Sequence, residues 1–191
     1  MDYDHHDSLV RAALRRLRDA RKLLDEPRGR SRSGVGDQHL RGAGYLAGYA
    51  VECTLKVYVI RHTPRALRWS EAVAEHNRRG RRPTLEARTH SLTQLFLATD
   101  LARYLDTDRG MKEKWGLCNM WRPSWRHNPD AHGPWRNRAE AENWIAAVAE
   151  IGYEGIELMF DEPHLLPVIE GFSHKVQRRR VEITFVLNEA V

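Results

Sequence analysis

The chain has 191 residues, enough for one domain with a buried core, and carries 31 basic against 26 acidic residues, a net charge of +5. The opening MDYDHHDS lacks the apolar segment of a signal peptide, and no run approaches 18 apolar residues. We therefore expect a cytoplasmic protein with no membrane segment. Most basic residues are arginine, which favours phosphate-bearing partners, although a GC-rich genome would enrich arginine as well.

Two helices are predicted in the first third of the chain. The first begins after a cap at Asp7 or Ser8, and its polar face is rich in arginine, turned either to solvent or to a nucleic acid. After a basic loop at 27–36, a long helix is expected at 38–62. Its first half contains many glycines and alanines, so we expect another helix to pack closely on it. Glu52 lies four residues before Lys56, a spacing that allows an ion pair.

The remaining elements follow from the same apolar spacing and from loop-forming residues. We expect a short helix at 70–76, a basic loop at 77–89, helices at 91–105 and 108–121, a loop at 122–135, a long helix at 137–161, and a strand at 180–187 that could form a hairpin with 164–169. The predicted fold is mainly α, a helical bundle with a small C-terminal β-hairpin or strand.

Metal and thiol chemistry find little support in the sequence. Ten histidines are present, but CxxC and HExxH patterns are missing, and His5 and His6 lie in a terminal segment. We therefore expect no metal and no cofactor. Cys53 and Cys118 lie among apolar residues, so both are predicted to be reduced packing groups rather than a disulfide or a reactive thiolate.

The segment WRPSWRH at 121–127 is the main candidate site. Cleaving RNA without metal needs proton transfer, which suits His127, and a cation on the phosphorane, which suits Arg122. Trp121 and Trp125 could stack on bases. An arginine five residues before a histidine is nevertheless expected about once by chance in this composition. The spacing alone therefore does not distinguish a catalytic pair from a coincidence.

Three segments resemble the HEPN family of helical-bundle proteins, which includes many prokaryotic toxins and defence ribonucleases. YLAGYAVECTLKVYVI (45–60) is similar to the family's second helix. THSLTQLFLATDL (89–101), with His90 near its start, resembles the opening of its third helix. WRPSWRHNPD (121–130) lies where the family keeps an arginine–histidine motif. The resemblance covers about residues 8–160, so we divide the chain into a bundle at 1–161 and an extension at 162–191.

The resemblance implies a four- to five-helix up-and-down bundle, commonly a homodimer, that cuts RNA without metal as a toxin or as an antiphage or stress effector, in some cases with an antitoxin or partner subunit. It implies that Arg122 stabilises the phosphorane and His127 moves protons. Arg126 would contact phosphate, and Glu52 would be either a polar group behind the substrate site or a structural partner of Lys56. The alternative is a non-catalytic nucleic-acid- or nucleotide-binding dimerisation module, in which Arg126 and His127 match the family's degenerate motif.

Overall fold

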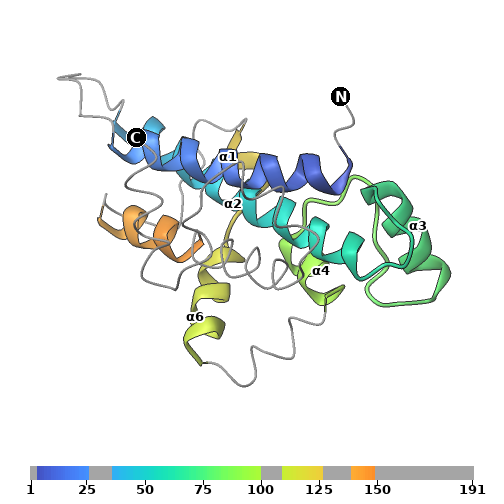
Figure 1. The fold of residues 1–191 in the computed structure, drawn as a ribbon. Helices are drawn as coiled ribbons and strands as arrows, with labels where there is room; N and C mark the ends of the chain where they lie inside the picture. The colour runs from blue at the N-terminus through green and yellow to red at the C-terminus, as the bar shows by residue number, and fades with distance from the viewer. Residues whose placement is uncertain (1–3, 26–35, 100–108, 127–138, 149–191) are drawn as a thin grey trace.

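The computed structural model describes residues 4–25, 36–99, 109–126 and 139–148, and this part is mainly helical, as predicted (Figure 1). Its labelled helices are α1 (His6–Asp25), α2 (Gly36–Arg61), α3 (Trp69–Arg78), α4 (Leu92–Leu97) and α6 (Arg109–Cys118). A 3-10 turn (η1) spans Pro123–Arg126, and residues 139–148 are also helical. The described segments contain no strand. The strand and hairpin predicted at 180–187 and 164–169 lie outside them.

Helices α1 and α2 form an antiparallel pair. The backbone N–H of His6 donates to Leu67 O at 3.0 Å, and that of Trp69, the first residue of α3, donates to Asp4 O at 2.8 Å, so the start of α1 lies beside the segment that follows α2. At the other end, Leu23 of α1 lies against Gly42 of α2. The contact face of α1 is built from small and apolar residues at three- and four-residue spacing, namely Val10, Ala13, Leu17 and Ala20.

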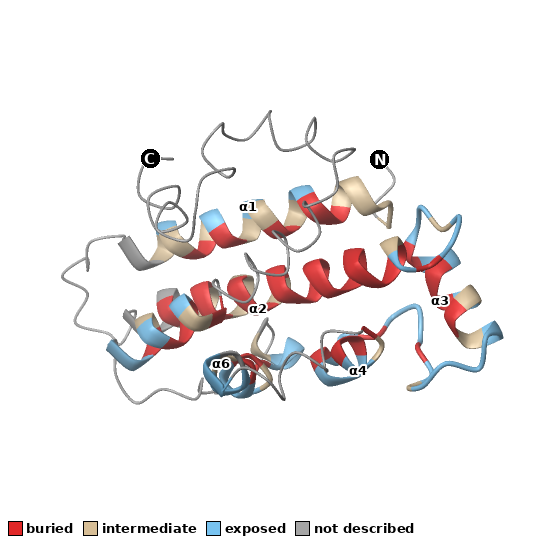
Figure 2. Ribbon diagram, turned by 60° about the horizontal axis from the view of Figure 1, so that its bottom comes forward, coloured by how far each residue is buried: buried red, intermediate tan, exposed pale blue. Residues whose placement is uncertain are grey.

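Helix α2 is the central element of the fold. Every residue from 50 to 60 is buried, which is the pattern of a helix covered on all sides (Figure 2). Figure 2 shows α1 along one side of α2, α4 and α6 along the other, and α3 near its C-terminal end. A polar side chain on this helix therefore reaches solvent only where a neighbouring element leaves a gap.

The glycine- and alanine-rich first half of α2 does accept a close neighbour. At Gly48 this neighbour is the side chain of a tryptophan rather than a whole helix. A Cβ atom at Gly48 would collide with the indole of Trp121, which follows α6. The indole Nε1–H also donates to Tyr45 O at 3.2 Å. Glycine is thus needed at position 48 because the indole of Trp121 occupies the place that a Cβ atom would take. The conformational freedom of the glycine backbone is not the reason.

Two helices are shorter than the sequence suggests. Helix α4 ends at Leu97 instead of continuing toward 105, and in the tight turn that follows both the N–H and the hydroxyl of Thr99 donate to Phe96 O, at 3.0 and 2.6 Å. Residues 100–108 lie outside the described part. Helix α6 ends at Cys118 rather than 121, where the N–H of Trp121 donates to Cys118 O at 3.0 Å in a tight turn.

Candidate functional site

Glu52 is a buried carboxylate in the middle of α2. Its side chain is 1% exposed, and Lys56 Nζ donates to its Oε1 at 2.6 Å, which confirms the pair predicted from the spacing. The ammonium group also lies 5.4 Å from the ring centre of Trp69, whose Nε1–H donates to Ala87 O at 2.8 Å. The charge of Lys56 is therefore satisfied by a carboxylate and an aromatic face, both inside the fold.

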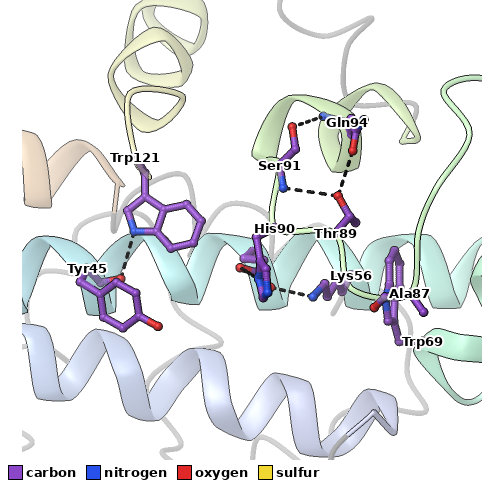
Figure 3. A network of polar contacts seen from close by, with 10 residues as sticks. Tyr45, Lys56, Trp69, Ala87, Thr89, His90, Ser91, Gln94 and Trp121 are labelled. Atoms are coloured by element: carbon purple, nitrogen blue, oxygen red, sulfur yellow. Dashed lines mark hydrogen bonds and ion pairs between the residues drawn. The ribbon is translucent and has the colours of Figure 1, made fainter. Parts of the chain in front are cut away.

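His90, which Figure 3 shows beside α2, is the second partner of Glu52. Its Nδ1 lies 3.0 Å from both carboxylate oxygens, while its side chain remains 51% exposed. A carboxylate that accepts a hydrogen bond from Lys56 can only accept from a histidine, so Nδ1 must carry the hydrogen. In the neutral imidazole this leaves Nε2 as a lone pair on the exposed side of the ring. Glu52 thereby fixes both the orientation and the tautomer of His90.

The residues beside His90 hold the turn into α4. The Thr89 hydroxyl donates to Gln94 Oε1 at 2.9 Å and accepts from Ser91 N–H at 3.4 Å. Ser91 in turn caps α4, since its hydroxyl accepts from Gln94 N–H at 3.3 Å. Figure 3 shows this group directly above α2. The position of His90 is therefore fixed by the bond of its ring to Glu52 and by the bonds of its neighbours Thr89 and Ser91.

Arg122 approaches from the turn after α6. It is exposed, and its Nη1 donates to Asn119 O at 2.7 Å and to Trp121 O at 2.8 Å. These carbonyls belong to the turn that ends the helix, where backbone acceptors are free. Among the described residues, none accepts from Nε or Nη2 of Arg122. One nitrogen thus fixes the guanidinium group, and within the described ranges the other two are left to donate to a ligand.

His90 and Arg122 line the same cleft, of about 380 Å³. Residues 90–93 form one side, and Asn119 with residues 121–123 forms the other. The hydroxyl of Thr93 donates to Asn119 Oδ1 at 2.7 Å and connects the two sides. We call this feature the His90–Arg122 cleft. Its volume lies within the range of small-ligand pockets, and its lining combines an imidazole, a guanidinium, hydroxyls and an amide.

The predicted base-stacking tryptophans are packed into the fold. Trp121 is 3% exposed and forms a wall of the cleft rather than an open platform. Trp125 is partly buried, with its ring centre 5.6 Å from that of Trp144. Trp121 therefore offers no open face on which a base could stack in this conformation, and the stacking role of Trp125 stays a prediction.

Two predicted site residues are not placed by the described structure. Arg126 ends η1, and its side chain is not described. His127 lies outside the described residues, so its pairing with Arg122 stays a prediction. The histidine that shares a cleft with Arg122 in the described part is His90.

The cysteines are buried and unpaired, as predicted for packing groups. Burial raises the pKa of Cys53 to about 12, and the nearby charge of Glu52 adds to the effect. Burial also raises the pKa of Cys118. A thiol needs its thiolate form to act as a nucleophile, so neither cysteine suits that role.

Comparisons with protein-family models, with curated proteins and with solved structures find no match for this chain. The resemblance to HEPN domains therefore stays a prediction from the three sequence segments. Among the described helices, none combines the length and the apolar character that crossing a bilayer requires.

Proposed function

We propose that this protein is a metal-independent endoribonuclease that uses the His90–Arg122 cleft. The observation that supports the proposal is the convergence of an oriented imidazole and an anchored guanidinium on one polar cleft. A base and a phosphate-binding cation are two of the groups that metal-free cleavage of RNA requires. The sequence segments that carry both groups are also those that resemble a ribonuclease family.

In this proposal His90 is the general base. Its Nε2 accepts the proton of the ribose 2′-hydroxyl as the 2′-oxygen attacks the adjacent phosphorus. The bond from phosphorus to the 5′-oxygen then breaks and leaves a 2′,3′-cyclic phosphate and a 5′-hydroxyl end. Glu52 is a positioning residue, because it holds Nδ1–H and stabilises the imidazolium that forms, as the carboxylate does in a carboxylate–histidine pair.

Arg122 is the phosphate-binding residue of the proposed reaction. Its Nε and Nη2 would donate to the non-bridging oxygens, whose negative charge grows in the transition state. Since Nη1 is already engaged by two carbonyls, the side chain needs little reordering when RNA binds. The exchange of arginine for lysine would lose this forked geometry.

The leaving 5′-oxygen needs a proton, and we assign this role to His127, which lies five residues after Arg122. Metal-free cleavage with a separate base and acid uses two proton-transfer groups, so His90 and His127 have complementary roles. Arg126 is proposed as a further phosphate contact. On the sequence resemblance alone, we extend the proposal to a homodimer. On the same basis we propose that the protein is a toxin or antiphage effector, with an antitoxin or partner subunit as its binding partner.

A non-catalytic module that binds nucleic acid or nucleotides is the second candidate. It is favoured by the bonds of Arg122 to Asn119 O and Trp121 O, which are also what a purely structural helix-ending arginine would make. Pro123 directly after the arginine fits the same reading. Under this alternative the cleft would bind a phosphate without cleaving it.

The test is incubation of total RNA and transfer RNA with the purified chain in EDTA, with the new ends identified chemically. We expect cleavage that leaves 2′,3′-cyclic phosphates. His90→Ala, His127→Ala and Arg122→Ala should each reduce the rate by about 100-fold or more. Glu52→Gln should reduce the rate and alter its pH profile, because the imidazolium loses its carboxylate partner. A merely structural Glu52 would leave the pH profile of the remaining activity unchanged.

Matched controls are His62→Ala and Arg109→Ala, two exposed residues that do not line the cleft. Both should cleave like the wild type, and circular dichroism should show that each variant is folded. If RNA binds with a steep salt dependence but stays intact, the ribonuclease proposal is wrong and the non-catalytic binding module is favoured. Full activity in His90→Ala would remove His90 from the mechanism.

A further inference from the structure

Three potential metal ligands adjoin one another at the start of α1. His5, His6 and Asp7 each offer one ligand atom, and these atoms all lie within 4.8 Å of one another. The sequence suggested no metal site, because two histidines near a terminus carry no information on their geometry. The cluster belongs to neither the His90–Arg122 cleft nor the proposed reaction.

The cluster is held in place by the segment between α2 and α3. The backbone N–H of His6 donates to Leu67 O at 3.0 Å, and His5 pairs with Arg68 in an antiparallel bridge. The hydroxyl of Ser70 donates to Asp4 Oδ2 at 2.7 Å. These bonds fix the backbone on which the three side chains are mounted, so the site is largely preformed.

The cluster holds more lone pairs than donors. His5 Nδ1 accepts the backbone N–H of Asp7 at 3.3 Å, so it has no hydrogen for Asp7 Oδ2, which lies 3.7 Å away. Two acceptors therefore face each other. His6 Nε2 lies 3.1 Å from Asp7 Oδ1, and His6 Nδ1 is buried without a hydrogen-bond partner in the described structure. A cation bound between His5 Nδ1 and Asp7 Oδ2 would relieve the repulsion between these two acceptors, and it would replace the long bond from the Asp7 N–H, because the nitrogen has one lone pair.

The spacing also suits a small transition metal. Zinc binds histidine nitrogen and carboxylate oxygen at about 2.0–2.2 Å, which places neighbouring ligands of a tetrahedral site about 3.3 Å apart. His6 Nε2 lies 3.1 Å from Asp7 Oδ1 and His5 Nδ1 lies 3.7 Å from Asp7 Oδ2, so each histidine is close to this spacing from one of the two carboxylate oxygens. Two imidazoles select against magnesium and calcium, which prefer oxygen ligands.

We propose that His5, His6 and Asp7 bind a divalent transition metal of zinc type. Three protein ligands leave a fourth position for water. Because the ligands begin α1 and their backbone is tied to residues 67–70, the ion stabilises the docking of the chain start against the segment that leads into α3.

The test is calorimetric titration of the tag-free full chain with zinc chloride, with thermal unfolding followed in parallel. We expect one zinc ion per chain and a higher melting temperature in its presence. His6→Ala and Asp7→Asn should each weaken zinc binding at least tenfold. His62→Ala and Asp19→Asn are the matched controls, and both should bind zinc like the wild type.

The chain has ten histidines, so zinc binding by the wild type alone does not show which of them hold the ion, and the variants are needed. Unchanged zinc affinity in His6→Ala and Asp7→Asn would mean that other histidines hold the ion, and the proposal would be wrong. The proposal would also be wrong if the wild-type chain bound no zinc at concentrations on the order of 100 µM, the range in which weak incidental sites bind. If His6→Ala does not fold, His5→Ala serves instead, since His5 precedes the helix. RNA cleavage in EDTA tests the ribonuclease separately, so either proposal can fail alone.

Discussion

Substitution of Gly48 by alanine tests the packing that places Trp121 and, through it, Arg122. The added methyl group would occupy the space of the indole. Overpacking of a tight core costs about 1–3 kcal/mol, and loss of the bond from Trp121 Nε1 to Tyr45 O adds about 0.5–1.5 kcal/mol. Alanine regains about 1 kcal/mol of helix propensity. The net expected destabilisation is about 0.5–3.5 kcal/mol.

An upper limit comes from complete expulsion of the indole. A tryptophan buries about 150–250 Å², which at about 25 cal/mol per Å² corresponds to about 4–6 kcal/mol. The structure offers a graded control series for the same substitution. At Gly42 the new Cβ would lie 3.2 Å from Leu23 Cδ1, the end of a flexible side chain, and at Gly116 no described atom lies within 4 Å.

The assay is thermal and urea unfolding followed by far-UV circular dichroism. We expect Gly116→Ala to raise stability slightly, Gly42→Ala to stay near the wild type, and Gly48→Ala to melt lower by about 2–4 °C per kcal/mol lost. Gly48→Ala should also lose RNA cleavage, because the turn that carries Arg122 moves with the indole. If Gly48→Ala were as stable as Gly116→Ala, the reasoning about the Trp121 seat would be refuted.

Two further predictions use the pKa values of groups away from the cleft. Burial raises the pKa of Cys53 to about 12 and also raises the pKa of Cys118. At pH 8 the folded chain should therefore react with a thiol-specific reagent more than about 1,000-fold more slowly than a free thiol of pKa about 8.5. Rapid labelling of the native protein would contradict this. Hydrogen bonds from Arg78, then Arg79, lower the pKa of Glu75 to about 2. Its contribution to stability is therefore present above about pH 4.5 and is lost as the pH falls toward 2. Glu75→Gln should be less stable than the wild type at pH 7, and the difference should shrink by pH 2, whereas a difference that did not change with pH would contradict the assignment.

The helical architecture could be predicted because the sequence repeats its apolar residues at helical spacing. The span of α2 agrees with the predicted 38–62 to within two residues at each end, since a long buried helix leaves a strong pattern. Helix ends were harder. The turn after Leu97 is closed by two bonds from Thr99 to Phe96 O, one from its N–H and one from its hydroxyl, which the apolar pattern does not register. Bonds of this kind compete locally with the helix and are decided by geometry.

The candidate site was only partly predictable. The spacing of Glu52 and Lys56 predicted their bond, because it depends on one helix alone. The contact of Glu52 with His90 joins residues 38 positions apart, and nothing local encodes it. A signal was present nonetheless: a buried carboxylate has more acceptor sites than one lysine can fill, so a second donor was to be expected. Which of ten histidines supplies it is a question of tertiary packing.

The two sides of the cleft are organised by one face of α2. Gly48, Glu52 and Lys56 follow one another at four-residue intervals, so they lie on the same side of the helix, each about 6 Å further along the axis. The indole of Trp121, which precedes Arg122, packs on Gly48, and the carboxylate of Glu52 holds the His90 ring by a hydrogen bond. Trp121 and His90 are therefore held about one helical turn apart along the most buried helix. A site on two loops obtains a rigid frame in this way, because neither loop can shift without disturbing the core.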